Sequence, residues 1–317
     1  MRLIALFLFL SVHTIPALAF AEAPVLCDSD SASLPPLRVA VIGAGPSGLF
    51  FCHAVEKILQ QQRMAECNNR IVEVTAFERS SHPGGLWQNK NENSDVSIYD
   101  NMWTNGPSFL HEFYDYTYDE HFGRPVDLFM PRQDVLEYIL ARVQKNSPDF
   151  FEKYVQFDTE VVNVRYIDSK QVFEVTTADV STGVVTKKIF DKCIWAAGVN
   201  GKASMPSELV EKLKEGGYEG RVIHSSDMSQ FENDVRGKRI VLVGASASAE
   251  DLALQAIKCG AAKVYVAMRW APPFDYTYLS FSGAWPVEIL AENQLTGTSE
   301  DGNSIFLEGV KYLVGVG

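Results

Sequence analysis

The sequence predicts an α/β fold in three layers, with two βαβ units and a β-meander inserted into the first. Apolar runs at 39–42 and 240–243 each lead into a turn of small residues and then into a helical pattern. Between them, residues 157–194 contain short β-type segments separated by turn residues at 168–170 and 181–183, which is typical of a meander. We therefore expect two Rossmann-like dinucleotide-binding domains, with further strands at 161–166, 172–177, 184–190 and 193–196.

The length and composition of the chain limit the classes of protein to which it can belong. The chain has 317 residues, which is enough for two domains. Its net charge of −12 argues against a nucleic-acid partner, because a general nucleic-acid binder needs a basic face. The five cysteines form no CxxC pair and the histidines show no metal-ligand spacing, so we expect neither a redox-active dithiol nor a metal site. Cys52 and Cys193 lie in apolar surroundings and are predicted to be small buried hydrophobes.

The N-terminal segment resembles a targeting sequence. Arg2 precedes an apolar run at 3–12, and a small-x-small pattern follows, so residues 1–21 are predicted to be a signal peptide or an N-terminal anchor. The expected localisation is the secretory pathway or endoplasmic reticulum, with a membrane contact through the N-terminus left open. A plastid is the alternative, because residues 20–24 resemble the cleavage site of proteins sent to secondary plastids. Residues 22–36, rich in Ser, Pro and Asp, are predicted to be a linker.

The first unit, residues 37–210, carries the sequence GxGxxG directly after its apolar strand. The first glycine permits the tight turn, the second lets the backbone approach a pyrophosphate, and the third lets the helix pack closely on the strand. The helix start offers N–H groups to the phosphates. A second strand at 71–77 ends in an acid that can bind a ribose. We predict an FAD-binding domain whose contacts are Gly43, Gly45, Pro46, Ser47, Gly48 and Glu78.

A second glycine-rich turn, Gly84-Gly85-Leu86-Trp87, follows that acid. The glycine pair would let the backbone approach a ligand, and Trp87 could cover a flat ring, so Gly85, Leu86 and Trp87 are candidate cofactor contacts. A structural turn with a buried tryptophan is equally open. The aromatic stretch at 109–122 suits a pocket wall or a packed core, of which the core is favoured. Residues 132–143 have helical spacing.

The second unit, predicted at 211–300, follows a short helix expected at 206–214. In its turn, Ser246 and Ala249 replace two glycines of the first motif, but small residues still permit close approach. The next strand, 262–267, is followed by Arg269 rather than by an acid. A cation there suits the 2′-phosphate of NADP, although a surface arginine is the alternative. We predict an NADPH-binding domain, and hence electron transfer between two cofactors, with contacts from Gly244, Ser246, Ser248 and Arg269.

Taken together, these residues resemble the flavin-containing monooxygenases over residues 37–317, particularly the bacterial trimethylamine monooxygenase-like members of that family. Residues 218–227 resemble the signature FxGxxxHxxx[F/W/Y], with Tyr218 in place of the phenylalanine and Met228 at the last aromatic position. Residues 84–87 match GGxW. Further stretches that resemble the bacterial members lie at 103–107, 119–123 and 246–251.

The resemblance implies a flavin-dependent monooxygenase that uses FAD, NADPH and O₂. Its substrates would be soft nucleophiles, such as tertiary amines and sulfides, which it would N- or S-oxygenate through a C4a-hydroperoxyflavin. By the same resemblance Asn105 is the catalytic residue beside the flavin ring. His224 of the signature is expected to hold a link between domains by hydrogen bonding rather than to act as a base, because the mechanism needs none there.

Two alternatives to the monooxygenase stay open at this point. The family continues beyond the hairpin that residues 301–317 resemble, so the chain would be truncated where it begins to return to the FAD domain. It could then be a non-catalytic remnant that binds FAD or NADP weakly. It could also be an NADPH oxidase that only makes peroxide. The sequence leaves a homodimer open.

Overall fold

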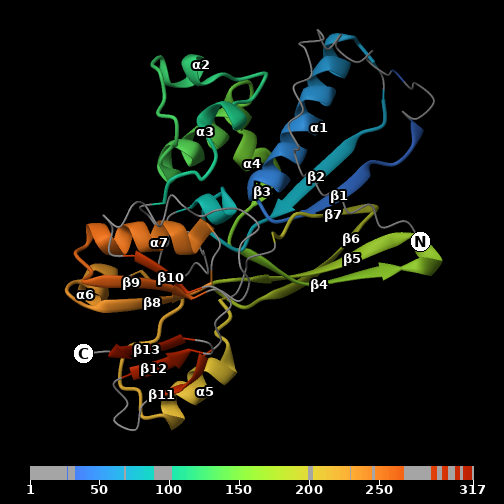
Figure 1. The fold of residues 1–317 in the computed structure, drawn as a ribbon. Helices are drawn as coiled ribbons and strands as arrows, with labels where there is room; N and C mark the ends of the chain where they lie inside the picture. The colour runs from blue at the N-terminus through green and yellow to red at the C-terminus, as the bar shows by residue number, and fades with distance from the viewer. Residues whose placement is uncertain are drawn as a thin grey trace. The chain divides into compact units, whose positions relative to one another are not determined.

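The computed structural model describes residues 27, 33–67, 69–88, 102–198, 203–228, 230–244 and 247–267, together with strand backbones at 287–290, 295–298, 304–307 and 310–315. The chain divides into two compact units, Met1–Gly201 and Lys202–Gly317, which are described separately. Each unit contains a parallel sheet with helices, so the predicted α/β class is confirmed (Figure 1). The predicted leader, residues 1–21, lies outside the described residues.

The first unit combines a parallel sheet of strand order β3-β2-β1-β7 with an antiparallel sheet of order β4-β5-β6. The antiparallel sheet is the predicted meander, and β7 returns from it to pair in parallel with β1. The elements of this unit are β1 (Leu37–Ile42), α1 (Pro46–Met64), β2 (Val72–Phe77), η2 (Gly85–Trp87), η3 (Ser108–Leu110), α2 (Tyr118–Phe122), α3 (Arg132–Gln144), α4 (Phe150–Tyr154), β3 (Val155–Gln156), β4 (Thr159–Ile167), η4 (Asp168–Lys170), β5 (Val172–Asp179), β6 (Val185–Phe190) and β7 (Lys192–Trp195).

Strand β1 separates two hydrophobic cores, because alternate side chains of a strand point to opposite faces of its sheet. Val39 and Val41 pack in the core shared with α1, α3 and α4. Ala40 and Ile42 face the meander on the other side. The unit therefore has the three predicted layers, which are helices, parallel sheet and antiparallel sheet (Figure 1). The second core is completed by Phe77, Val175 and Phe190.

The aromatic stretch at 109–122 contributes partly to the first core, as favoured from the sequence. Tyr116 and Tyr118 are buried there, and Tyr138 of α3 stacks on Tyr116 with ring centroids 5.5 Å apart. The Tyr138 hydroxyl also accepts a hydrogen bond from the Phe113 backbone N–H at 2.9 Å. Burial raises the pKa of Tyr138 to about 12, so this hydroxyl stays protonated and can donate to the Tyr116 carbonyl. Other members of the stretch are exposed, namely Phe109, Leu110 and Tyr114.

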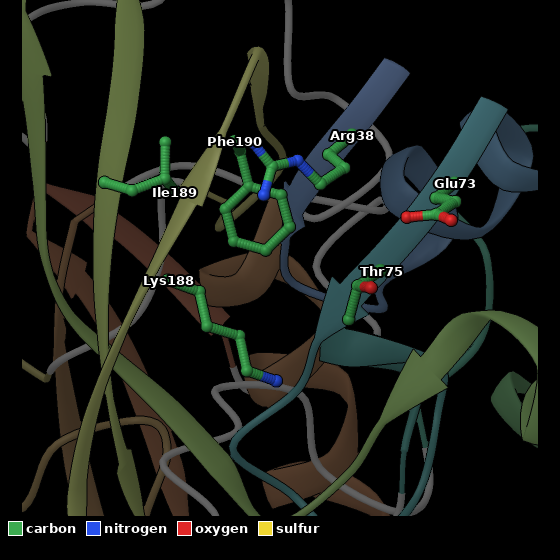
Figure 2. Close-up of a pocket in the computed structure, with 6 residues that line it drawn as sticks. All are labelled: Arg38, Glu73, Thr75, Lys188, Ile189 and Phe190. Carbon is green, nitrogen blue, oxygen red and sulfur yellow. The ribbon is translucent and has the colours of Figure 1, made fainter. Parts of the chain in front are cut away.

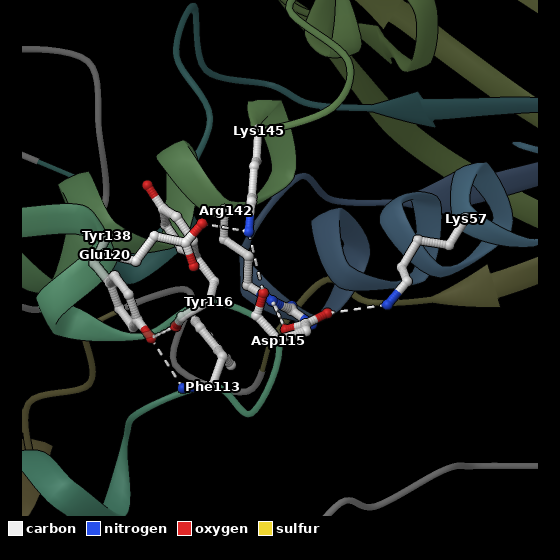
Figure 3. A network of polar contacts seen from close by, with 8 residues as sticks. All are labelled: Lys57, Phe113, Asp115, Tyr116, Glu120, Tyr138, Arg142 and Lys145. Atoms are coloured by element: carbon white, nitrogen blue, oxygen red, sulfur yellow. Dashed lines mark hydrogen bonds and ion pairs between the residues drawn. The ribbon is translucent and has the colours of Figure 1, made fainter. Parts of the chain in front are cut away.

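Asp115 connects this stretch to two helices (Figure 3). Its carboxylate accepts hydrogen bonds from Lys57 of α1 at 3.2 Å and from Arg142 Nε of α3 at 2.9 Å. The Arg142 guanidinium also lies over the rings of Phe50 and Phe113, 4.9 and 4.2 Å from their centroids. Burial by itself would raise the pKa of Asp115, but the hydrogen bonds and charges of Arg142 and Lys57 outweigh it and lower this pKa.

Replacing Asp115 by asparagine should lower the free energy of unfolding by about 2 kcal/mol at neutral pH, because two cations lose their charged acceptor. The lowered pKa means that the stabilisation is complete above about pH 4 and is lost as the pH falls below it. Urea unfolding at several pH values measures both effects. Asp127→Asn, at an exposed carboxylate, is the control and should change stability by less than about 0.5 kcal/mol. Equal stabilities of D115N and D127N would contradict the prediction.

A disulfide joins Cys27 to Cys67, a pairing that the sequence did not reveal. It attaches the chain before β1 to the segment that follows α1. Cys52 is a free thiol that is fully buried in the first core, as predicted. Burial raises the pKa of Cys52 to about 12 and that of the half-buried Cys193 to about 11. Both groups therefore stay as unreactive thiols at neutral pH.

Reduction of the Cys27–Cys67 disulfide should lower the free energy of unfolding by about 2–4 kcal/mol, because the cross-link closes a loop of 40 residues. Denaturant unfolding with and without a thiol reductant measures the change. The double variant C27S/C67S should behave like the reduced protein and should not respond to reductant. A reductant effect that persists in the double variant would show that the destabilisation has another origin.

The second unit has a parallel sheet of strand order β10-β9-β8 and an antiparallel sheet of order β11-β12-β13. The strands predicted from the apolar runs at 240–243 and 262–267 and the helix predicted at 206–214 are confirmed to within one residue. The domain boundary predicted at 210/211 stays a prediction. The elements are α5 (Ser207–Glu215), α6 (Phe231–Val235), β8 (Arg239–Val243), α7 (Ala247–Lys258), β9 (Lys263–Ala267), β10 (Val287–Leu290), β11 (Leu295–Thr298), β12 (Ser304–Leu307) and β13 (Val310–Gly315).

Candidate functional site

The glycine-rich turn after β1 is closely packed. Gly43 has φ +99°, and a Cβ there would lie 2.7 Å from the Ala196 carbonyl oxygen. A Cβ at Gly48 would lie only 2.0 Å from the carbonyl oxygen of Gly43. Side chains at these two positions would therefore collide with backbone atoms. The tight turn and the close helix packing that the motif predicted are both present.

The start of α1 is suited to an anion. Gly45 is the N-cap residue, Pro46 follows within the first turn, and that turn contains no acidic residue. The first backbone hydrogen bond of the helix runs from Leu49 to Gly45 at 3.0 Å, so the N–H groups of Ser47 and Gly48 precede the helical ladder. They point out of the N-terminal end, where the helix dipole is positive. A phosphate placed there would find both donors and a favourable field.

Glu78 is held at the same turn. It follows β2 directly and is buried, with 8% of its surface exposed. One carboxylate oxygen accepts a hydrogen bond from the Ala44 N–H at 2.8 Å, and the other accepts from the Ser80 N–H at 2.9 Å. A carboxylate that is fixed beside the phosphate-binding turn is the arrangement expected for a ribose contact.

The second glycine-rich turn packs against the first. The Gly84 N–H donates to the Ala44 carbonyl at 2.9 Å, and a Cβ at Gly85 would lie 2.9 Å from the Cα of Gly45. Trp87 is half-buried against the first core. The glycine pair therefore has a structural role, which was one of the two sequence interpretations. Cofactor contacts from Gly85, Leu86 and Trp87 stay predictions.

Asn105 lies on an exposed turn that is held by its buried neighbour Thr104. The Thr104 hydroxyl donates to the Gly106 carbonyl at 2.8 Å and accepts from the Met130 N–H at 3.0 Å. The Thr104 N–H also donates to the Met130 carbonyl at 2.8 Å. The hydroxyl thus connects the residue after Asn105 to the neighbouring segment, which fixes the backbone on both sides of the predicted catalytic residue.

Arg132 connects the Asn105 turn to the segment 84–87, which packs on the glycine-rich turn after β1. The sequence predicts Arg132 only as the first residue of a helix. Its side chain is fully buried and donates to the Trp87 carbonyl, while its N–H donates to the Met102 carbonyl at 2.9 Å. The structure therefore brings together the glycine-rich turn, Glu78, the segment 84–87 and the Asn105 turn. A signal was present in the sequence, because Arg132 lies three residues before Val135 on the buried face of α3.

Replacing Thr104 by valine should lower the free energy of unfolding by about 1–2 kcal/mol, because the buried N–H of Met130 and the Gly106 carbonyl both lose a partner. Thr104→Ser keeps the hydroxyl and is the matched control, with a smaller loss expected. Chemical denaturation of the three proteins makes the comparison. A serine variant that is as unstable as the valine variant would assign the effect to the methyl group instead.

In its described residues, the second unit has a turn after β8 that resembles the glycine-rich turn after β1. The Gly244 N–H donates to the Ala267 carbonyl at 2.9 Å, as the Gly43 N–H donates to the Phe77 carbonyl at 2.9 Å. Gly244 has φ +120°, and Ser248 is exposed near the start of α7. The other two predicted contacts, Ser246 and Arg269, lie outside the described residues.

The signature at 218–227 has a local structural role. The ring of Tyr218 lies so close to Gly220 that a Cβ there would be 2.1 Å from it, which explains why a glycine follows the aromatic residue. His224 Nδ1 accepts a hydrogen bond from the Ser226 N–H at 3.1 Å, and the Asp227 N–H donates to the His224 carbonyl at 2.9 Å. Hydrogen bonding, rather than base catalysis, is the role this geometry supports for His224.

A cavity of about 380 Å³ lies in the first unit, away from these turns (Figure 2). Arg38 and Glu73 occupy the second positions of β1 and β2, whereas the glycine-rich turn follows the opposite ends of these strands. Cofactors of parallel α/β sheets bind at the carboxyl ends of the strands, so this cavity is not the predicted cofactor site. Its wall is completed by Thr75, Lys188, Ile189 and Phe190.

Comparison with known proteins identifies the family. Residues 37–274 match the family described as FMO-like, flavin-binding monooxygenase-like, and the chain belongs to it. A trimethylamine monooxygenase of Pelagibacter ubique is 37% identical over 74% of this chain and 51% of that protein. Dimethylaniline monooxygenase [N-oxide-forming] 2 of Oryctolagus cuniculus is 30% identical over 81% of this chain and 42% of that protein.

A solved structure agrees with this assignment. The crystal structure of Tmm from Pelagibacter sp. strain HTCC7211 is similar with a TM-score of 0.71 and 30% identity, covering 86% of this chain and 57% of that chain. The resemblance to flavin-containing monooxygenases is therefore confirmed. The chain spans about half the length of the curated relatives described above.

The predicted secretory-pathway or endoplasmic-reticulum localisation, and the plastid alternative with it, is wrong. The relatives that the chain matches include trimethylamine monooxygenases of Pelagibacter and Methylocella, and this similarity does not support an anchor in the secretory pathway. Within the part of the chain that the structure describes, no helix combines the length and apolar character needed to span a membrane. The prediction rested on an apolar run beside small residues, and this composition does not by itself define a cellular location.

Proposed function

We propose that this chain is an FAD-, NADPH- and O₂-dependent monooxygenase that N- or S-oxygenates tertiary amines or sulfides. The observation that carries the proposal is the joining of three turns in the first unit. The Gly84–Ala44 and Arg132–Trp87 hydrogen bonds connect the anion-binding turn to the segment that presents Asn105. Relatives named trimethylamine monooxygenase and dimethylaniline monooxygenase support an amine as the substrate.

The first unit fits FAD. Gly43, Gly45 and Gly48 leave no side chain in the turn, and the N–H groups that precede the helical ladder of α1 can bind the pyrophosphate. The buried carboxylate of Glu78 is placed for the ribose. Bound there, the flavin would supply the redox chemistry that activates O₂ at the expense of NADPH, which no amino-acid side chain can provide. Contacts from Pro46, Ser47, Gly85, Leu86 and Trp87 are part of the same proposal.

The second unit is proposed to bind NADPH. Gly244 begins a turn with the same backbone hydrogen bond as the FAD turn, and small residues follow it. Ser246 and Ser248 would donate to the phosphates, and Arg269 would pair with the 2′-phosphate. A homodimer and a membrane contact through the N-terminus stay predictions.

Asn105 is proposed to hold the reacting groups. Its amide can donate a hydrogen bond to an oxygen atom without releasing a proton, so it can orient that oxygen while water is kept away. The Thr104 hydroxyl fixes the turn, so the amide is presented from a defined backbone. A residue with this role affects how much oxygen reaches the substrate rather than how much flavin is bound.

The test is performed on the purified chain. We expect it to take up FAD, which is read from its visible spectrum, and to consume NADPH in air while trimethylamine N-oxide forms. Asn105→Ala should keep the flavin but lose N-oxide by about tenfold or more, which corresponds to about 1.4 kcal/mol, with peroxide formed in its place. Asn163→Ala, at an exposed asparagine on β4, is the matched control and should behave like the unaltered protein.

Two outcomes would contradict the proposal. A chain that stays colourless when FAD is added would support the non-catalytic alternative. NADPH consumption that yields peroxide alone, with every amine and sulfide tried, would indicate an oxidase. In either case the family assignment would stand, because it does not depend on activity.

A further inference from the structure

We propose that Asn105 deamidates spontaneously in the flavin-free protein and is protected when flavin is bound. The residue proposed to hold the reacting oxygen would then convert to aspartate or isoaspartate as the empty protein ages. The protective part of this inference rests on the proposed function, which places flavin beside Asn105. The chemical part rests only on the turn itself.

The first observation is the residue that follows Asn105. Position 106 is glycine, which leaves the backbone nitrogen accessible to the preceding side chain because no Cβ hinders the approach. The imidazole of His111 lies against this position, because a Cβ built on Gly106 would be 2.8 Å from its Nε2. Asn105 itself is exposed, whereas its neighbour Thr104 is buried. The turn therefore combines a labile dipeptide with access to water.

The reaction balances without any cofactor or oxidant. The backbone nitrogen of Gly106 attacks the side-chain amide carbon of Asn105, a carbon–nitrogen bond forms, and the amide nitrogen leaves as ammonia. Water then opens the five-membered succinimide at either carbonyl and yields aspartate or isoaspartate. The imidazole of His111, which lies against Gly106, supplies a base that can accept the proton of the attacking nitrogen.

Both products would disable the turn. Aspartate replaces an amide donor by a negative charge that can only accept hydrogen bonds. Isoaspartate lengthens the main chain by one carbon between Thr104 and Gly106, which are joined by the 2.8 Å hydrogen bond from hydroxyl to carbonyl. The hydroxyl cannot keep this bond and its bond from the Met130 N–H across a longer backbone.

The experiment incubates the purified chain in mildly alkaline buffer, with and without saturating FAD, and follows each asparagine peptide by mass spectrometry. The sequence contains a second Asn–Gly pair, Asn200–Gly201, which provides a comparison within every sample. We expect Asn105 to convert at least about tenfold more slowly when FAD is bound, because a covered amide loses access to water.

Two variants test the geometry. Gly106→Ala should slow conversion of Asn105 by about tenfold, because a Cβ hinders the attack. His111→Gln removes the base but keeps the glycine, so it should slow Asn105 several-fold and leave Asn200 unchanged. It also serves as the second test if the alanine variant does not fold.

The outcomes separate this inference from the proposed function. An Asn105 that stays intact in the flavin-free chain while Asn200 converts would overturn the inference, whatever the activity. Equal conversion of Asn105 with and without bound flavin would overturn the protection. If the chain takes up no FAD, deamidation at Asn105 would still be measured and would support the chemical part, although the proposed function would have failed.

Discussion

The first unit depends on the close approach of two backbones. Gly45 ends the strand-to-helix turn and Gly85 lies in the segment after Glu78, and a Cβ on Gly85 would lie 2.9 Å from the Cα of Gly45. Because Gly85 has no side chain, the two segments can come close enough for the Gly84 N–H to donate to the Ala44 carbonyl. That contact brings Trp87 to the place where its carbonyl accepts from the buried Arg132. A side chain at Gly85 would therefore displace the Asn105 turn as well as the phosphate-binding turn.

The buried guanidinium of Arg132 gives this arrangement its rigidity. A buried charge is costly unless hydrogen bonds satisfy it, so its partners are held strongly in place. The guanidinium donates to the Trp87 carbonyl, and the backbone N–H of the same residue donates to the Met102 carbonyl, so Arg132 connects two segments that are far apart in the sequence and carry different predicted tasks. One residue thus connects the segment 84–87 to the segment that precedes Asn105.

Sequence reasoning succeeded where the constraint is local. The strand before Gly43, the turn at Gly43, the close packing at Gly48 and the strand before Gly244 follow from a few adjacent residues. The meander was predictable because strand-type segments alternate with turn residues. The sequence could not decide whether Gly84-Gly85 forms a structural turn or contacts a cofactor. A glycine that packs against backbone atoms and a glycine that contacts a ligand look the same in a sequence.

The long-range partners could not be predicted. Nothing in the sequence pairs Cys27 with Cys67, or Asp115 with Lys57 and Arg142, because these contacts depend on how helices and loops pack. The burial of the Arg132 side chain was not predicted for a different reason, since charged residues are usually expected outside the core. The mistaken localisation arose from composition alone, without any structural context to test it.

The strand order β3-β2-β1-β7 also determines when, during synthesis, β1 can pair with both of its neighbours. Strand β1 is the first to leave the ribosome, yet one of its two neighbours, β7, begins only at Lys192, about 150 residues after β1 ends. At about 5–20 residues per second, one edge of β1 waits about 8–30 s for its partner. During that interval an apolar strand with a free edge is exposed to other chains. The growing chain is thus most vulnerable to aggregation before the parallel sheet is complete.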